Sequence, residues 1–225
     1  MQKVYFISGT MCTVDLWQFV FSDLVNIIPI HIDITAAISF DDVNEIILSK
    51  TEEKAIIVGF SLGGFSALNF AIHYPDKIKK MIIIAASPNG LSDDEYLLRK
   101  SIIGFLEVNK YKGISQVRIK HFLHPNHQNK KNISIIKKMD ADLGKDVLIR
   151  QLKATSTRLD ITQQVLALNI PVIFIAAEND TLISAAAVKE FANKMIKGKY
   201  FSIKNCGHMI PLEKPNELSQ IINML

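Results

Sequence analysis

The stretch that decides the fold class is Ala55–Gly64, AIIVGFSLGG, within a chain of 225 residues. Its first four residues predict a strand buried on both faces, and a helix-like run over residues 62–74 follows and stops before a proline. Between them lies the pattern G-x-S-x-G, which in a strand–turn–helix context holds a serine on a sharp, strained turn above the sheet. Ser61 is therefore the candidate nucleophile. Gly59 and Gly63 are interpreted as structural, because a side chain at either position would collide with the neighbouring strand or helix.

Short apolar runs alternate with helix-like segments on both sides of this turn. This alternation is typical of a parallel sheet with helices on both faces. With right-handed crossovers it predicts an α/β fold with a doubly wound, mostly parallel sheet of about six strands. Ligands bind such sheets beyond the carboxyl ends of the strands, so chemistry is sought there. The expected strands are residues 3–8, 27–32, 55–58, 78–86, 171–176 and 199–203, and the expected helices are residues 16–25, 41–50, 62–74, 184–197 and 216–224.

Residues 88–160 interrupt the alternation. They contain no strand-like run and are predicted to form several short helices. We therefore expect a core made of residues 1–87 and 161–225, with residues 88–160 inserted as a helical cap, or lid. The insertion holds 14 Lys and Arg against 8 Asp and Glu, a net charge of +6, whereas the whole chain has 26 against 22, a net charge of +4. The remainder is thus slightly acidic, and the mild overall charge conceals a basic insertion.

The composition excludes several classes of protein. A hydrophobic content of 48% is too high for a disordered chain, and two cysteines are too few for a disulfide scaffold. Apolar runs such as Met81–Ala86 are far shorter than the ~20 residues of a membrane span. The N-terminus also lacks the apolar segment of a secretory signal. We expect a cytoplasmic protein that binds neither membrane nor nucleic acid, with Cys12 and Cys206 as small, buried free thiols.

A serine nucleophile needs a general base, and the base needs a carboxylate that orients it. His208 is the candidate base, because it lies late in the chain, directly after the last expected strand. Asp180 and Glu178 both follow the fifth expected strand. Asp180, 28 residues before His208, is the preferred acid, and Glu178 is interpreted as a solvated loop residue. The oxyanion formed during hydrolysis would be bound by two backbone N–H groups, those of Leu62 and Thr10.

Four blocks of the chain resemble the α/β-hydrolase fold superfamily: SGTMCTVDLW, GFSLGG, IPVIFIAAEND and CGHMIPLEKP. The resemblance extends over both predicted core segments. It implies that Ser61, Asp180 and His208 form a catalytic triad and that Thr10 and Leu62 form an oxyanion hole. It also implies that residues 88–160 form a helical cap.

Three departures from the family's pattern stand out. Ser8 replaces the first residue of the family's His-Gly pair, and Ala177 replaces a Gly that is common before the acid. The expected sheet also lacks the family's N-terminal pair of strands. That would leave an exposed sheet edge, for which a homodimer is one solution.

The basic insertion has two interpretations. A charge excess is usually a solvated face, here within a Lys-rich chain. Within the resembled family, pimeloyl-acyl-carrier-protein methyl ester esterases present a basic cap to an acidic carrier protein. The size and compact cap of this chain are compatible with that group, so an acidic carrier protein is a candidate partner.

The remaining motifs narrow the chemistry. His121, His124 and His127 are spaced by three, but Pro125 interrupts them, which favours a polar loop over a metal site. The sequence has no phosphate-cradling motif, and we expect neither a metal nor a cofactor. The leading hypothesis is a serine hydrolase that cleaves a carboxylic ester or thioester of a small to medium acyl substrate through an acyl-enzyme. C–C bond hydrolysis, lactone opening and lyase chemistry use the same triad, and a non-catalytic binding protein is the third alternative.

Overall fold

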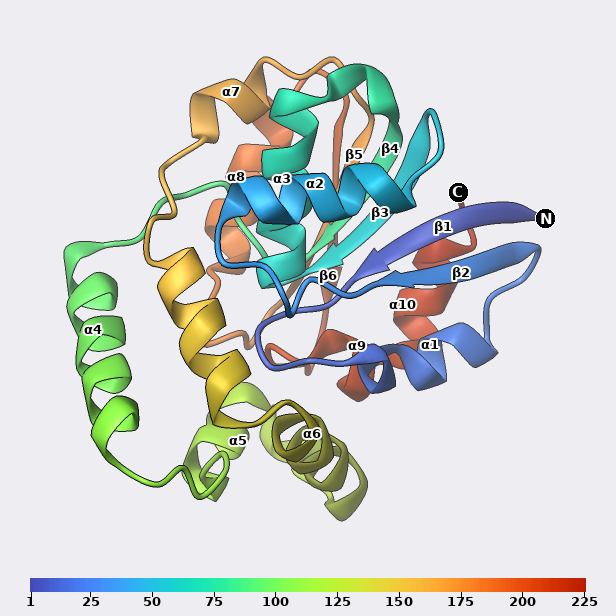
Figure 1. Cartoon of the computed structure of the whole chain (residues 1–225). Coiled ribbons are helices and arrows are strands. Elements are labelled where there is room, and N and C mark those ends of the chain that lie inside the picture. Colours follow the sequence, from blue (N-terminus) through green and yellow to red (C-terminus); the bar gives the residue numbers. More distant parts are fainter.

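The chain forms one sheet of six strands in the order β2-β1-β3-β4-β5-β6, with every neighbouring pair parallel (Figure 1). The computed structural model describes all of residues 1–225. The strands are β1 (Gln2–Ile7), β2 (Ile27–Ile32), β3 (Ala55–Phe60), β4 (Ile78–Ile84), β5 (Val172–Ala177) and β6 (Gly198–Ile203). The predicted α/β fold class is confirmed, and the expected strands differ from these only at their ends.

Helices cover both faces of the sheet, and a further group lies beyond its end. The helices of the core are α1 (Gln18–Ser22), α2 (Phe40–Lys50), α3 (Leu62–His73), α7 (Thr162–Leu166), α8 (Ala185–Lys194), α9 (Ile210–Glu213) and α10 (Pro215–Ile222). The group between β4 and β5 is α4 (Asp93–Val108), α5 (Gln116–Phe122) and α6 (Lys130–Thr155). Three short 3-10 helices are η1 (Val14–Trp17), η2 (Pro75–Lys77) and η3 (Pro125–His127).

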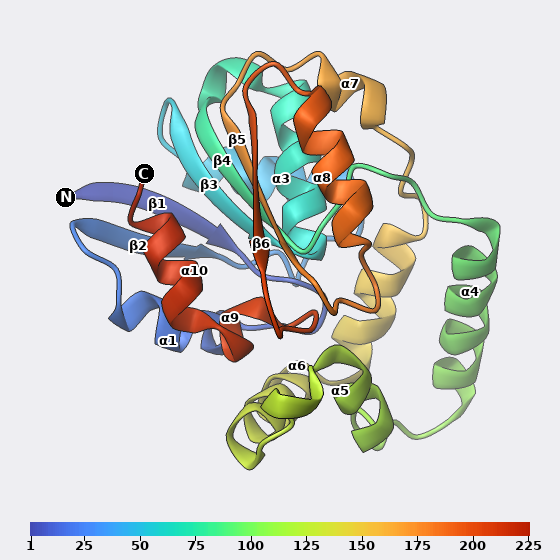
Figure 2. The same cartoon turned by 180° about the vertical axis from the view of Figure 1, so that it is seen from behind.

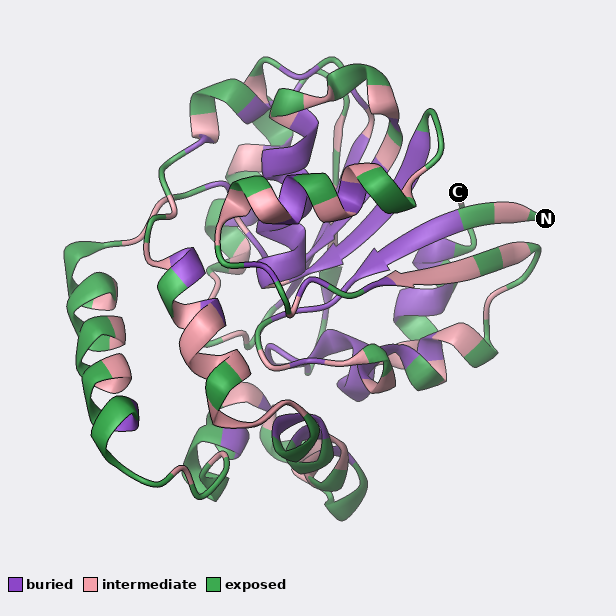
Figure 3. Cartoon of the chain, in the orientation of Figure 1, coloured by how far each residue is buried: buried purple, intermediate pink, exposed green.

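The two faces of the sheet carry two separate apolar cores. Helices α2, α3, α7 and α8 pack on one face, and η1, α1, α9 and α10 cover the other (Figures 1 and 2). Strand β3 is buried at all six positions, because its side chains alternate between the cores. Ile57 belongs to one core, and Ile56 and Val58 belong to the other. Burial is concentrated in the central strands and in α3 (Figure 3).

Side-chain caps set where the longer helices begin. Ser39 accepts a hydrogen bond from the Asp42 amide at the start of α2, and Ser92 accepts one from the Glu95 amide at the start of α4. Asn129 and Ser184 do the same for α6 and α8. Each cap satisfies an amide that the helix itself leaves without an acceptor.

Residues 88–160 form α4, α5 and α6, which lie together away from the bulk of the sheet (Figures 1 and 2). The segment labelled α6 spans 26 residues, but its backbone is not helical at Gly144, where φ is 70° and ψ is −173°. Two helical stretches meet at a sharp kink there, in a conformation that a glycine adopts at little steric cost. Helix α4 buries only Leu106. None of the helices in the structure combines the length and the apolarity that crossing a membrane requires.

The central strand should dominate the stability of the fold. Ile57 on β3 has no exposed surface, whereas Ile28 on the edge strand β2 is 38% exposed. Replacing Ile57 by alanine should lower the free energy of unfolding by about 3 kcal/mol, because the closely packed core cannot fill the cavity. The control Ile28→Ala should cost less than about 1 kcal/mol. Urea unfolding at pH 7 measures both, and equal losses would contradict the two-core packing.

Candidate active site

Ser61 lies at the sharp turn between β3 and α3, with φ 51° and ψ −116°. A side-chain-bearing residue rarely adopts this conformation, which is typical of strained functional turns. The turn is possible because β1, β3 and α3 approach closely. A Cβ on Gly59 would lie 2.4 Å from the Gly63 carbonyl oxygen, and one on Gly63 would lie 2.2 Å from the Ile7 carbonyl oxygen. Neither position accepts a side chain unless the backbone moves.

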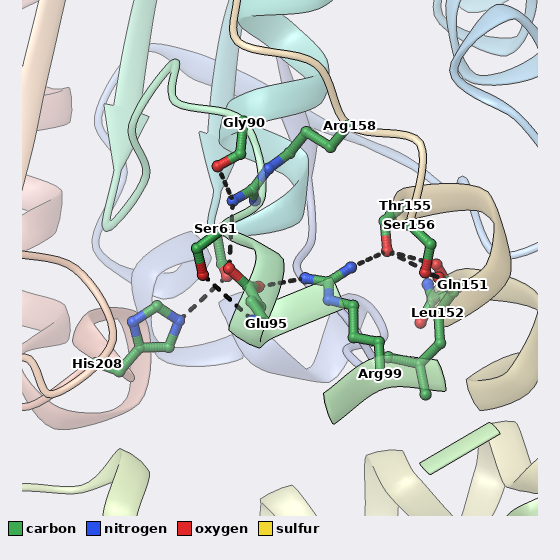
Figure 4. Close-up of polar contacts among 11 residues, drawn as sticks. Ser61, Gly90, Glu95, Arg99, Gln151, Leu152, Thr155, Ser156, Arg158 and His208 are labelled. Atoms are coloured by element: carbon green, nitrogen blue, oxygen red, sulfur yellow. Dashed lines mark hydrogen bonds and ion pairs between the residues drawn. The ribbon is translucent and has the colours of Figure 1, made fainter. Parts of the chain in front are cut away.

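The structure brings Ser61, His208 and Asp180 together in one hydrogen-bonded chain. The Ser61 Oγ lies 3.1 Å from His208 Nε2, and His208 Nδ1 lies 2.8 Å from Asp180 Oδ2 (Figure 4 shows the Ser61–His208 contact). The side chain of His208 is 5% exposed and that of Asp180 is fully buried. These are the distances at which an imidazole can take the serine proton while a carboxylate holds its tautomer.

The second oxygen of Asp180 holds the acid in place. Asp180 Oδ1 accepts hydrogen bonds from the backbone amides of Leu182 and Ile183, at 2.8 and 3.1 Å. The alternative acid, Glu178, is exposed on the same loop and makes no side-chain contact with His208. Of the two candidate carboxylates, only Asp180 reaches the histidine.

The loop after β1 lies against Ser61. A Cβ on Gly9 would lie 3.1 Å from the Ser61 Cβ, so the backbone of the loop can approach the nucleophile closely. The Thr10 amide, on this loop, donates to no group of the chain. The Leu62 amide opens α3, where no acceptor precedes it within the helix. Both predicted oxyanion donors are therefore free to bind an external oxygen.

Ser8, which departs from the family's His-Gly pair, anchors this loop. Its Oγ accepts a hydrogen bond from Trp17 Nε1 at 2.9 Å and lies 2.9 Å from His31 Nε2. It also lies 3.2 Å from the carbonyl oxygen of Thr13, to which it donates. Burial lowers the pKa of His31, which favours a neutral ring in this contact. A serine thus ties β1, β2 and the following loop together.

Two residues at the site were not predicted from the sequence. The first is Gln151 on α6. Its Oε1 accepts a hydrogen bond from the Met11 amide at 2.9 Å, across 140 residues of sequence. Met11 has a φ of 54°, so this bond holds a strained residue next to Thr10. No local pattern signals a contact over such a separation.

The second such residue is Glu213, which holds the loop that carries His208. Its carboxylate accepts three backbone hydrogen bonds, from Gly207 at 3.0 Å, Met209 at 3.0 Å and His124 at 2.8 Å. Burial raises the pKa of Glu213, and the amide donors oppose that rise. The signal available in the sequence was an acid five residues after His208, in CGHMIPLE.

The other candidate residues lie outside this arrangement. Burial raises the pKa of the Cys12 thiol to about 12, and it also raises the pKa of Cys206, so neither is a ready thiolate. His124 Nδ1 accepts from the Asn126 amide, and His127 Nε2 donates to the Asn205 carbonyl. No three His, Cys, Asp or Glu side chains gather as a metal site.

Comparison with known proteins assigns the family. Residues 37–215 match the model of the alpha/beta hydrolase fold family. The chain belongs to this family. An abhydrolase domain-containing protein of Schizosaccharomyces pombe is 29% identical over an alignment of 186 residues that covers 77% of this chain and 67% of that protein. This α/β hydrolase also resembles a pimeloyl-[acyl-carrier protein] methyl ester esterase of Wigglesworthia glossinidia brevipalpis, with 48% identity over 50 residues.

That second match covers 22% of this α/β hydrolase and spans about a fifth, 19%, of the esterase. Among solved structures, a thermophilic esterase from Thermogutta terrifontis superposes with a TM-score of 0.83 and 18% identity. The superposition covers 100% of this chain and 89% of that one. Family membership and esterase-named relatives together support a hydrolase enzyme.

Glu213→Gln tests the support of the histidine loop. An amide has one acceptor oxygen, so at least one buried backbone N–H would lose its partner, and its NH2 group would face a donor. The variant should lose about 2 kcal/mol of stability and on the order of tenfold in kcat, because His208 shifts. The control is Glu217→Gln, which removes only an exposed ion pair with Lys214. Thermal unfolding and ester hydrolysis measure both effects, and a variant indistinguishable from this control would refute the supporting role.

Proposed function

We propose that this α/β hydrolase cleaves a carboxylic ester or thioester through a covalent acyl-serine intermediate. The observation that carries the proposal is the continuous contact from Ser61 Oγ through His208 to Asp180, at 3.1 and 2.8 Å. In this geometry a weak nucleophile lies next to a base, and the base lies next to a carboxylate.

The reaction follows from the position of each group. Ser61 Oγ attacks the carbonyl carbon while His208 Nε2 takes its proton, and the Asp180 carboxylate stabilises the imidazolium. The amides of Leu62 and Thr10 bind the oxyanion. His208 then gives the proton to the departing alcohol or thiol, and the acyl-enzyme forms. Water repeats the sequence, with His208 as base again, and releases the acid and free Ser61.

The segment over residues 88–160 is proposed to act as a cap that shapes the acyl-binding pocket. A small, mostly apolar pocket is lined by Leu62, the residue after the candidate nucleophile, by Phe40 and Val43 of α2, and by Ala154 and Thr155 of α6. Its walls come from both the core and α6, so a displacement of α6 would enlarge the apolar space next to Leu62 for an acyl group.

Substitution of the triad tests the mechanism. Ser61→Ala should lower kcat on p-nitrophenyl esters by at least about a thousandfold and abolish labelling by a fluorophosphonate probe. Asp180→Asn should lower kcat by on the order of 10⁴, since it favours the wrong tautomer of His208. Glu178→Gln on the same loop is the matched control and should leave kcat unchanged. Unimpaired hydrolysis by Ser61→Ala would contradict the proposal. If the wild-type enzyme prefers lactones or vinylogous diketones to p-nitrophenyl esters, the bond that it cleaves is a lactone or a C–C bond.

The basic segment supports a second proposal, that the acyl group arrives on an acidic carrier protein. Residues 88–160 carry a net charge of +6. Several of its cations, among them Lys112, Lys120 and Lys130, are exposed and form no ion pair. An acidic partner would be steered by such a surface.

Salt dependence tests this docking. An acyl-carrier protein should bind the enzyme at low ionic strength and lose at least about tenfold in affinity between 50 and 300 mM NaCl, because exposed charges are screened. The double variant Lys120→Glu and Lys130→Glu should abolish the salt-sensitive part. Lys189→Glu, an exposed cation on α8, is the control. Binding that is insensitive to salt and to the double variant would exclude electrostatic recruitment.

A further inference from the structure

Two arginines beside the site share a single carboxylate. Arg99 on α4 and Arg158, three residues after α6, both contact Glu95 (Figure 4). Arg99 Nη2 lies 2.7 Å from Glu95 Oε1, and Arg158 Nη2 lies 3.9 Å from Glu95 Oε2. Both arginine side chains are only 17% exposed. Two guanidinium groups against one carboxylate leave an excess positive charge in a largely buried place.

Arg158 is the member of this cluster whose donors are not satisfied. A guanidinium has five N–H donors, yet that of Arg158 makes one hydrogen bond, 3.5 Å long, to the Gly90 carbonyl. Its Nε is buried and has no partner. Arg99, by contrast, makes short hydrogen bonds to Glu95 and to Thr155 Oγ1. Buried charged donors are normally paired, so Arg158 has the capacity to bind another acceptor.

The position of Arg158 relates this capacity to the substrate. Its guanidinium carbon lies 5.1 Å from the centre of the Phe65 ring. The Phe65 amide bonds to the Ser61 carbonyl at 3.1 Å, so Phe65 is one helical turn beyond the nucleophile. Thr155, the acceptor for Arg99, lines the same pocket as Leu62. Figure 4 draws Ser61 between His208 and the arginine cluster.

From this arrangement we infer that Arg158, with Arg99 beside it, binds a free carboxylate of the substrate, which is then a half-ester or half-thioester of a short dicarboxylic acid. The carboxylate of Glu95 bonds to Arg99 at 2.7 Å but lies 3.9 Å from Arg158, so a carboxylate reaches this place and leaves the donors of Arg158 open. An incoming carboxylate would occupy the open donors of Arg158 while Glu95 keeps Arg99. The kinetic consequence rests on the proposed function, whereas the binding site itself does not.

Binding is therefore tested apart from catalysis, in the Ser61→Ala variant by calorimetry. Monomethyl glutarate, with one free carboxylate, should bind at least about tenfold more tightly than dimethyl glutarate. A second substitution, Arg158→Gln, should remove that difference. The control Arg118→Gln should leave the difference in affinity unchanged. Like Arg158, Arg118 lies over an aromatic ring, that of Phe122, but its side chain is exposed. Equal binding of the two glutarate esters would overturn the inference.

Catalysis supplies the second readout. With Ser61 present, p-nitrophenyl hydrogen glutarate should show a KM about tenfold below that of its methyl-capped counterpart at a similar kcat, and Arg158→Gln should raise only the former KM. If Arg158→Gln fails to fold, Glu95→Gln tests the same site. It removes the carboxylate of Glu95, which competes for the arginines, so it should tighten the binding of monomethyl glutarate. An unchanged affinity would overturn the inference. Inorganic phosphate that competes as well as glutarate would also overturn it, by indicating a general anion site. Loss of hydrolysis together with retained glutarate selectivity would refute the hydrolase mechanism and leave the carboxylate site intact.

Discussion

The close approach of β1, β3 and α3 is the constraint on which the rest of the site depends. With glycine at positions 59 and 63, the first turn of α3 touches the backbone of both strands, at distances where any Cβ would overlap a carbonyl group. The same contact brings the loop after β1 against Ser61. The strain at Ser61 is tolerated because α3 is buried over almost its whole length. Ser61 and the loop after β1 are thus placed by a single packing contact.

The segment over residues 88–160 is bonded to two loops of the core. Its residue 122 accepts a hydrogen bond from the His208 amide at 2.8 Å, and its residue 124 shares the carboxylate of Glu213 with the histidine loop. Gln151, from the end of the same segment, holds the strained Met11. Movement of this segment would therefore reach His208 and the loop after β1 together. The helical segment and the Ser61–His208–Asp180 contacts are coupled by hydrogen bonds to the backbone, which tolerate little displacement.

Much of this arrangement could be predicted from the sequence, because the features concerned depend on residues that are close together in the chain. A buried parallel strand needs a run of apolar residues, and a strand–turn–helix with two glycines needs ten consecutive positions. Asp180 and His208 followed from their places after two such strands. The kink at Gly144 within α6 was not predicted, because composition alone does not distinguish a kinked junction from a loop between two helices.

The sequence by itself determined the fold class, the strands, the serine turn and the order of nucleophile, acid and base, since each depends on neighbours in the chain. Only the tertiary structure showed which groups Ser8 binds in place of the family's histidine, and which backbone amides Glu213 and Gln151 accept hydrogen bonds from. It alone placed Arg99 and Arg158, 59 residues apart, around the carboxylate of Glu95. The physical reason is that hydrogen bonds and charge balance in a buried site are set by distances in space, and those distances arise only when the two cores pack.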